Sequence, residues 1–210
     1  MRLARRHALL AVAGSVLAGS ALPLAAARAQ ATDPRLTERA TGKADAPVTV
    51  QEFFSLTCGH CAAFHRDTWP QVKRELVDTG MVRMVWRDFP LDRVALAGAA
   101  VARALPPERY EPFIGTLLAN QERWAFRPDP IEELQKLATL AGMSRATFEQ
   151  VRGDEAYLRA ILNDRLEAER QFQVQATPSF AFQSAGRTRN HSGNLPFEQF
   201  QRLAQEVRRG

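Results

Sequence analysis

The 210-residue sequence contains only two cysteines, Cys58 and Cys61, and four histidines. Two cysteines cannot supply the disulfide framework typical of small secreted domains. A zinc site built on a Cys-x-x-Cys pair normally needs a second such pair or two histidines. With 45% hydrophobic residues, the chain is long enough to bury an ordinary core. We therefore expect a globular protein that folds without disulfides and leaves its two cysteines free for another task.

Outside the N-terminus, neither sign of charge is in clear excess. Four of the 28 Lys and Arg residues lie in the first 29 residues, which contain no acid, and the rest of the chain mixes the two signs. No run of basic residues is longer than two. Attraction to a polyanion depends on clustered positive charge, so the net charge of +5 does not indicate nucleic acid as a partner.

Residues 1–29 have the three parts of a secretory signal peptide. A charged start that includes Arg5-Arg6 precedes residues 8–27, which contain no charged side chain, and Ala27-Arg28-Ala29 provides small residues at a cleavage site. The arginine pair partly fits a twin-arginine signal. An uncleaved membrane anchor is the alternative, although the stretch is rich in Ala, Gly and Ser. We expect export to the periplasm, an oxidising compartment.

Residues 47–91 show a strand–helix–strand pattern. Residues 48–54 are β-branched and aromatic, which indicates a buried strand. Residues 62–76 have the apolar spacing of a helix, with a kink expected at Pro70. Residues 81–89 alternate as a second strand. The short return between the strands predicts a parallel pair in an α/β sheet.

Residues 92–173 interrupt this pattern with amphipathic helical stripes, one of which starts at Asp129-Pro130. Residues 174–210 restore it, since a short strand, a turn and a polar partner strand precede a last helix. Residues 30–46 are polar, and we expect a loose lead-in there. The fold class predicted from these segments is α/β with an inserted helical subdomain.

The Cys58-Gly59-His60-Cys61 motif lies where the first strand should pass into its helix. A helix N-terminus presents unpaired N–H groups and the positive end of the helix dipole, so it stabilises a thiolate. This favours Cys58 as the nucleophile, and a protonated His60 would add positive charge beside it. Cys61, one turn further on, can close or resolve a disulfide. The pair is a candidate redox-active disulfide that needs no metal or organic cofactor.

Two alternatives from other classes use neighbouring residues. A metal-handling protein, for copper for example, could use Cys58, Cys61 and His65, because soft thiolates suit Cu(I). As a lone residue, His65 is otherwise expected to be a solvated helix residue. A peptide-binding chaperone could use a groove at Thr177, with the thiols incidental. A purely structural disulfide is a poorer explanation, since so short a loop stabilises little.

Glu52 and Thr177-Pro178 are further candidates for the site. Glu52 lies in a strand that otherwise has the pattern of a buried one, where a carboxylate is costly without a partner or a task. It is a candidate proton acceptor for Cys61, and the alternative is a strand-edge glutamate that faces water. Thr177-Pro178 opens the strand after the helical block, and base rates alone make its peptide bond trans.

Together these segments resemble the DsbA-like branch of the thioredoxin superfamily. The likeness covers about residues 46–207, and its motifs are Glu52-Phe-Phe-Ser-Leu-Thr-Cys58-Gly-His-Cys61, Phe64-His65, Arg87-Asp88-Phe89-Pro90-Leu91, Ala119-Asn120-Gln121-Glu122-Arg123-Trp124 and Ala176-Thr177-Pro178-Ser179-Phe180. The resemblance implies a thioredoxin fold with an inserted helical subdomain. It also implies that Cys58 attacks and Cys61 resolves. Pro178 is expected to be cis, with the Thr177 backbone beside an extended substrate, and Glu52 matches the buried acid of the family.

The function that the resemblance implies is periplasmic thiol–disulfide exchange. The expected partners are exported cysteine-containing proteins and a membrane redox protein that resets the thiol pair. No N-terminal dimerisation domain is evident, which favours a monomer. A dithiol oxidase is the expected direction. Gly59 and Thr177 stand where the oxidase branch has proline and valine, which keeps a reductase or isomerase as the alternative.

Overall fold

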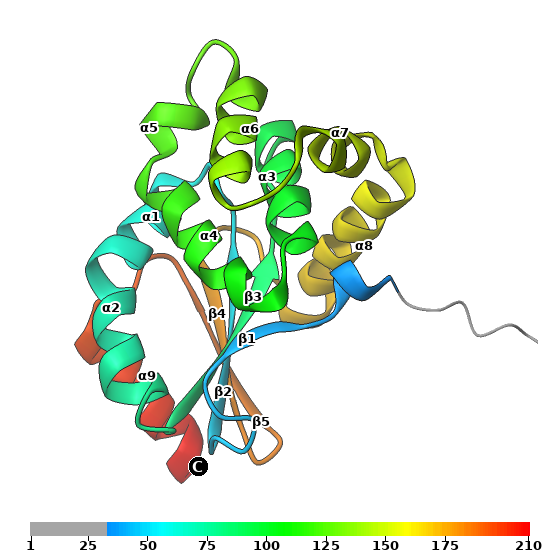
Figure 1. Ribbon diagram of the computed structural model, residues 1–210. Helices are drawn as coiled ribbons and strands as arrows, with labels where there is room; N and C mark the ends of the chain where they lie inside the picture. The colour runs from blue at the N-terminus through cyan, green and yellow to red at the C-terminus, as the bar shows by residue number, and fades with distance from the viewer. Residues whose placement is uncertain (1–32) are drawn as a thin grey trace, which may run out of the picture. The chain divides into compact units, whose positions relative to one another are not determined.

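The computed structural model describes residues 33–210, which form a five-stranded mixed sheet covered by helices (Figure 1). The predicted signal peptide, residues 1–29, lies outside the described residues. The sheet has the order β1-β3-β2-β4-β5, and its strands are β1 (Arg39–Thr41), β2 (Val48–Phe54), β3 (Val82–Asp88), β4 (Ser179–Ser184) and β5 (Arg187–Ser192). The β2 and β3 strands are parallel, and the other pairs are antiparallel. The predicted α/β class, the parallel pair and the late hairpin are thus confirmed.

The central strand β2 is apolar because helices cover both faces of the sheet. Val50 and Phe54 belong to the large core, which includes residues of the helix after β2 and of the C-terminal helix α9 (Phe197–Arg209). Phe53 points to the other face, where its ring lies 5.1 Å from that of Phe172. Since successive side chains of a strand alternate between faces, Glu52 shares the face of Val50 and Phe54.

The helix that follows β2 runs without a break from Gly59 to Val77, but its hydrogen-bond pattern changes along its length. It begins as α1 (Gly59–Ala63), includes α2 (Trp69–Val72), and has π-helical turns at Phe64–Thr68 and Lys73–Val77. Pro70 cannot donate a backbone hydrogen bond and crowds the carbonyl of the preceding turn. The irregularity predicted at Pro70 therefore takes the form of π-helical turns on either side of α2.

The helical block between β3 and β4 is built from six helices. They are α3 (Arg93–Ala104), α4 (Pro107–Ala119), α5 (Gln121–Trp124), α6 (Pro130–Leu140), α7 (Arg145–Gly153) and α8 (Glu155–Phe172). Asp92 caps α3 and Asp129 caps α6, because each side chain accepts a hydrogen bond from a first-turn N–H group. No helix within residues 33–210 has the length and apolar character needed to cross a membrane.

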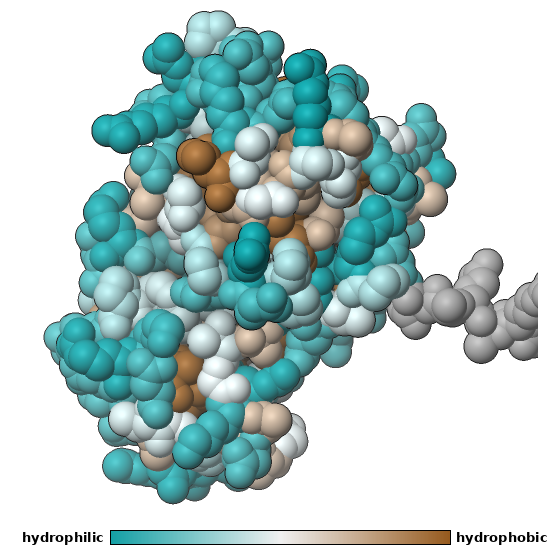
Figure 2. Space-filling model, viewed as in Figure 1, coloured by the Kyte–Doolittle hydropathy of each residue, from teal (hydrophilic) through white to brown (hydrophobic). Residues whose placement is uncertain are grey.

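An apolar groove marks the outer surface of this helical block. Figure 2 shows apolar side chains gathered over the region of α4 and α6 and bordered by hydrophilic ones. Phe113, Leu137 and the exposed Leu140 line the groove, together with polar residues of α4. All of its lining residues come from α4, α6 and the turn after α6, so it is separate from the two cysteines.

The expected loose lead-in over residues 30–46 is wrong in part, because Arg39–Thr41 forms β1 and pairs with β3. Arg39 is buried despite its charge. Its guanidinium donates to the carbonyl oxygen of Arg103 at 3.0 Å and to that of Thr37 at 3.1 Å. These partners allow burial, since a buried donor is tolerated when it is hydrogen-bonded.

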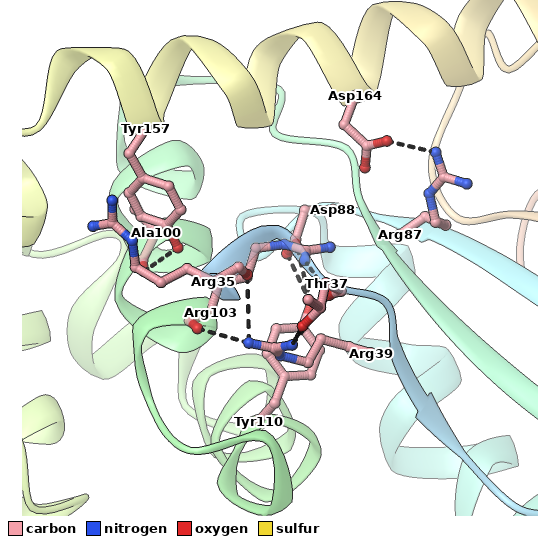
Figure 3. Close-up of polar contacts among 10 residues, drawn as sticks. All are labelled: Arg35, Thr37, Arg39, Arg87, Asp88, Ala100, Arg103, Tyr110, Tyr157 and Asp164. Carbon is pink, nitrogen blue, oxygen red and sulfur yellow. Dashed lines mark hydrogen bonds and ion pairs between the residues drawn. The ribbon is translucent and has the colours of Figure 1, made fainter. Parts of the chain in front are cut away.

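A buried polar network joins the end of β3 to the helical block (Figure 3). The Asp88 carboxylate accepts hydrogen bonds from the Arg103 guanidinium of α3 and from the Tyr110 hydroxyl of α4, the latter at 3.0 Å. Arg103 also donates to the Thr37 carbonyl at 3.2 Å, so the guanidinium groups of Arg39 and Arg103 converge on the segment before β1. One carboxylate therefore links the sheet, two helices and the N-terminal segment.

We expect the substitution Asp88→Asn to lower the free energy of unfolding by about 3–5 kcal/mol, because it leaves the Arg103 charge buried without a counter-charge. Urea denaturation followed by circular dichroism measures the change. Asp164→Asn is the matched control, because its ion pair with Arg87 at 2.7 Å is partly exposed. That control should cost at most about 1 kcal/mol. Equal small losses in both variants would contradict the importance of the Asp88 network.

Candidate active site

Cys58 lies at the junction between β2 and α1, where it is the N-cap residue of the helix. Its backbone is extended, and its carbonyl accepts the Ala62 N–H at 3.1 Å, so the helix starts directly after it. The residue is partly exposed. The sequence prediction placed Cys58 at a strand-to-helix junction, and the structure confirms that position.

Cys61 lies one turn further into the helix and is completely buried in the large core. Both cysteines are free thiols in this structure. The two sulfurs therefore occupy opposite environments within one turn, since Cys58 reaches the surface and Cys61 does not.

The pKa of Cys58 is lowered to about 5, chiefly because the Cys61 thiol donates a hydrogen bond to its sulfur. Burial opposes this by raising the pKa. The Thr177 side chain and the backbone N–H groups of Cys61 and His60 lower it further. At neutral pH the Cys58 sulfur is accordingly a thiolate, which is the nucleophilic form.

The pKa of Cys61 is raised well above its ordinary value, first because burial disfavours the thiolate. The hydrogen bond that Cys61 donates to Cys58 also raises it, as do the negative charges of Cys58 and Glu52. Cys61 therefore keeps its proton under conditions in which Cys58 has lost its own. A proton acceptor is needed before Cys61 can attack.

The loop before β4 approaches the two cysteines from a distant part of the chain. The Thr177–Pro178 peptide bond is cis, as the resemblance implies. The thiol form of Cys58 donates to the Thr177 carbonyl oxygen at 3.2 Å. The buried Thr177 hydroxyl has no hydrogen-bond partner, so it remains available as a donor to the thiolate. The structure thus brings Thr177 and Pro178 together with Cys58.

His60 is exposed on the first turn of α1. Its contribution to the low pKa of Cys58 comes through its backbone N–H group. The expected contribution of a protonated imidazole has no counterpart among the causes of that shift. Gly59 is also exposed, and a Cβ atom built on it would meet nothing within 4 Å.

Glu52 is fully buried, so the alternative of a strand-edge glutamate that faces water is wrong. The expectation of a solvated His65 is also wrong, because His65 is buried and its Nε2 lies 3.3 Å from a Glu52 carboxylate oxygen. The two residues meet because Glu52 points to the face of the sheet that is covered by the helix carrying His65.

Among residues 33–210, no group of three or more His, Cys, Asp or Glu side chains is arranged to hold a metal ion. Cys58, Cys61 and His65 are therefore not arranged as a metal site.

Sequence reasoning gave no role to Gln121, which holds the cysteine loop in place. Its side-chain amide donates to the carbonyl oxygens of Leu56 at 2.8 Å and Cys58 at 3.0 Å. Asp92 supports the same loop, because it accepts the Thr57 hydroxyl at 2.6 Å while it caps α3. The only sequence feature that points to Gln121 is its place in one of the motifs that resemble the DsbA-like branch.

Comparison with known proteins agrees with this geometry. A family model described as thioredoxin matches residues 35–205. A Rickettsia typhi protein, provisionally named a protein-disulfide oxidoreductase, is 31% identical over 153 residues, which cover 72% of this chain and 56% of the relative. Disulfide bond formation protein D of Bacillus subtilis is 25% identical over 146 residues, which cover 66% of this chain and 64% of the relative. The chain thus spans little more than half the length of the Rickettsia relative.

Solved structures show the same fold. Wolbachia pipientis alpha-DsbA1 has a TM-score of 0.76 at 26% identity, covering 82% of this chain and 92% of that one. BdbD of Bacillus subtilis shares the fold with a TM-score of 0.68 at 18% identity, covering 82% of this chain and 94% of that one. The chain belongs to the thioredoxin family. Within this family it is a DsbA-like member, with a helical block inserted between β3 and β4.

We expect the rate of Cys58 alkylation by iodoacetamide to fall by half at about pH 5 and to be flat at neutral pH, because the pKa of Cys58 is about 5. Cys61→Ala should move this midpoint to higher pH, since it removes the largest cause of the lowered pKa. Cys61→Ser retains a hydroxyl donor and should move it less. A midpoint near the ordinary cysteine value of about 8.5 in the unsubstituted protein would contradict the assignment.

Proposed function

We propose that this protein exchanges disulfides with cysteine-containing proteins through the Cys58–Cys61 pair. The observation that carries the proposal is the opposite character of the two thiols, which are one helical turn apart. Cys58 is accessible and has a lowered pKa, whereas Cys61 is buried and has a raised one. Such a pair suits one cysteine that exchanges with a partner and another that closes the disulfide internally.

In the oxidising direction, a substrate thiolate attacks the Cys58 sulfur of the oxidised pair. The Cys58–Cys61 bond breaks, and Cys61 leaves with the electron pair and takes up a proton. A second substrate thiolate then attacks the substrate sulfur of the mixed disulfide, which releases Cys58 as the stabilised thiolate. The substrate leaves with a new disulfide, and the pair leaves reduced.

The remaining site residues have supporting roles in this proposal. Glu52 transfers the proton of Cys61, since it is a buried carboxylate whose charge acts on that thiol. Thr177 and Pro178 bind an extended substrate, because the Thr177 backbone lies beside the Cys58 sulfur. His60 supports the Cys58 thiolate through its backbone N–H group.

The direction we favour is that of a dithiol oxidase. Every interaction that stabilises the Cys58 thiolate stabilises the reduced pair relative to the disulfide, and this makes the disulfide more oxidising. We place the protein in the periplasm because of the signal-peptide pattern at residues 1–29. There it acts as a monomer on exported proteins, and a membrane redox partner resets the pair.

The Cys61→Ser variant should accumulate covalent adducts between Cys58 and substrate proteins, because the resolving thiol is missing. Incubation with a periplasmic extract, followed by non-reducing electrophoresis and mass spectrometry, detects them. A variant in which serine replaces both Cys58 and Cys61 should trap nothing and is the control. Absence of adducts in both variants would count against exchange chemistry and favour a chaperone that uses the Thr177 loop.

The reduction potential of the pair decides the direction. We expect a value well above the roughly −270 mV of thioredoxin, together with oxidation of a reduced cysteine substrate in glutathione buffer. Equilibration with defined glutathione ratios, followed by alkylation and mass analysis, measures the potential. A value near that of thioredoxin, with strong insulin reduction and no oxidase activity, would indicate a reductase instead.

A further inference from the structure

The buried carboxylate of Glu52 has one basic neighbour in the described part of the chain. His65 is the only Lys, Arg or His side chain of residues 33–210 with a nitrogen within 4.0 Å of it. Neither Glu52 oxygen has a hydrogen bond, and the Nε2 atom of His65 has none either. Polar atoms that are buried in this way are normally paired, so the 3.3 Å contact between Glu52 and His65 is the one available pairing.

Aromatic rings hold His65 against the carboxylate. The distance between ring centroids is 5.3 Å from His65 to Trp86, 5.8 Å to Phe64, 6.0 Å to Phe54 and 6.4 Å to Trp69. This apolar surrounding strengthens electrostatic interactions and makes an unshared charge costly. Glu52 and His65 therefore form one buried polar unit, in which an acid and a base lie in contact.

His65 also connects this unit to the outside. Its Nε2 atom is fully buried, yet 5% of the side chain is exposed, so the exposed portion lies on the rest of the side chain. The Glu52 carboxylate, by contrast, is completely buried. Cys61 of α1 is a titratable group on which Glu52 acts, and Glu111 of α4 accepts the indole N–H of Trp69, a neighbour of His65, at 2.9 Å. His65 is thus the part of the unit that reaches closer to the surface.

We propose that His65 relays the proton of Cys61 between Glu52 and solvent, an inference that rests on the proposed function. When the Cys61 sulfur attacks the Cys58 sulfur of a mixed disulfide, its proton passes to Glu52 and leaves through the imidazole. The Cys58–Cys61 bond forms, and the partner leaves as a thiolate with the electron pair of the broken bond. The reverse path returns a proton to Cys61 when the pair is reduced. His65 thus acts on Cys61 only through Glu52.

The test measures the rate at which Cys61 displaces glutathione from Cys58, which is called the resolution step below. Reduced protein is mixed with excess oxidised glutathione, samples are quenched with acid, and mass spectrometry follows the Cys58–glutathione adduct as it converts to the internal disulfide. At about pH 7 we expect His65→Gln to slow this first-order step by roughly tenfold, because general acid–base assistance is lost. The deficit should shrink towards about pH 10, where hydroxide removes the Cys61 proton directly.

Comparison variants separate a proton relay from a structural role. Glu52→Gln should be at least as slow as His65→Gln, and the double variant should be no slower than Glu52→Gln, since both residues serve one path. His191→Gln, which changes a histidine outside the site, should resolve at the unsubstituted rate. Circular dichroism confirms folding, and His65→Asn replaces His65→Gln if the latter does not fold.

Two results would overturn the relay: resolution at the unsubstituted rate across the whole pH range, or slowing by the same factor at every pH. A missing resolution step in the unsubstituted protein would instead refute the proposed function itself. The two failures are therefore distinguishable in one set of measurements.

Discussion

The bond between Asp88 and Arg103 is the interaction on which the arrangement of this molecule depends. The carboxylate stands at the end of β3, where the α/β unit gives way to the helical block, and it binds α3 and α4 at the same time. The α4 helix leads directly into α5, and α5 carries Gln121 to the carbonyls of Leu56 and Cys58. The charge pair thus anchors the helix that precedes the one supporting the thiol loop.

The same short stretch of helix gives the two sulfurs opposite properties. At the start of α1, the Cys58 sulfur meets hydrogen-bond donors from Cys61, His60 and Thr177. One turn later, the Cys61 sulfur meets apolar side chains and the negative charges of Cys58 and Glu52. A single α-helical turn is enough for this contrast because it spans the distance from surface to core. The side chains and backbone of the chain itself create this difference in acidity.

Much of the fold follows from local pattern, and the parts that do not are pairings between distant residues. The strand over 48–54 and the helix start at Asp129 are evident from composition and capping alone. Arg39 looks like a loop residue because two of the groups that surround it when it is buried, the Arg103 carbonyl and the Tyr110 ring, lie more than sixty residues away. His65 looks solvated for the same reason, since Glu52 is on another element. The cis bond at Pro178 was expected from the resemblance, and no local signal distinguishes it.

The two residues between the cysteines are free of packing constraints. Gly59 and His60 are exposed, and a larger side chain at position 59 would meet open space. The core beneath α1 therefore does not select what stands there. Substitutions at these positions can alter the local field and stiffness of the loop while the folding free energy stays nearly constant. The packing of the core and the identity of these two exposed residues are in this way separable.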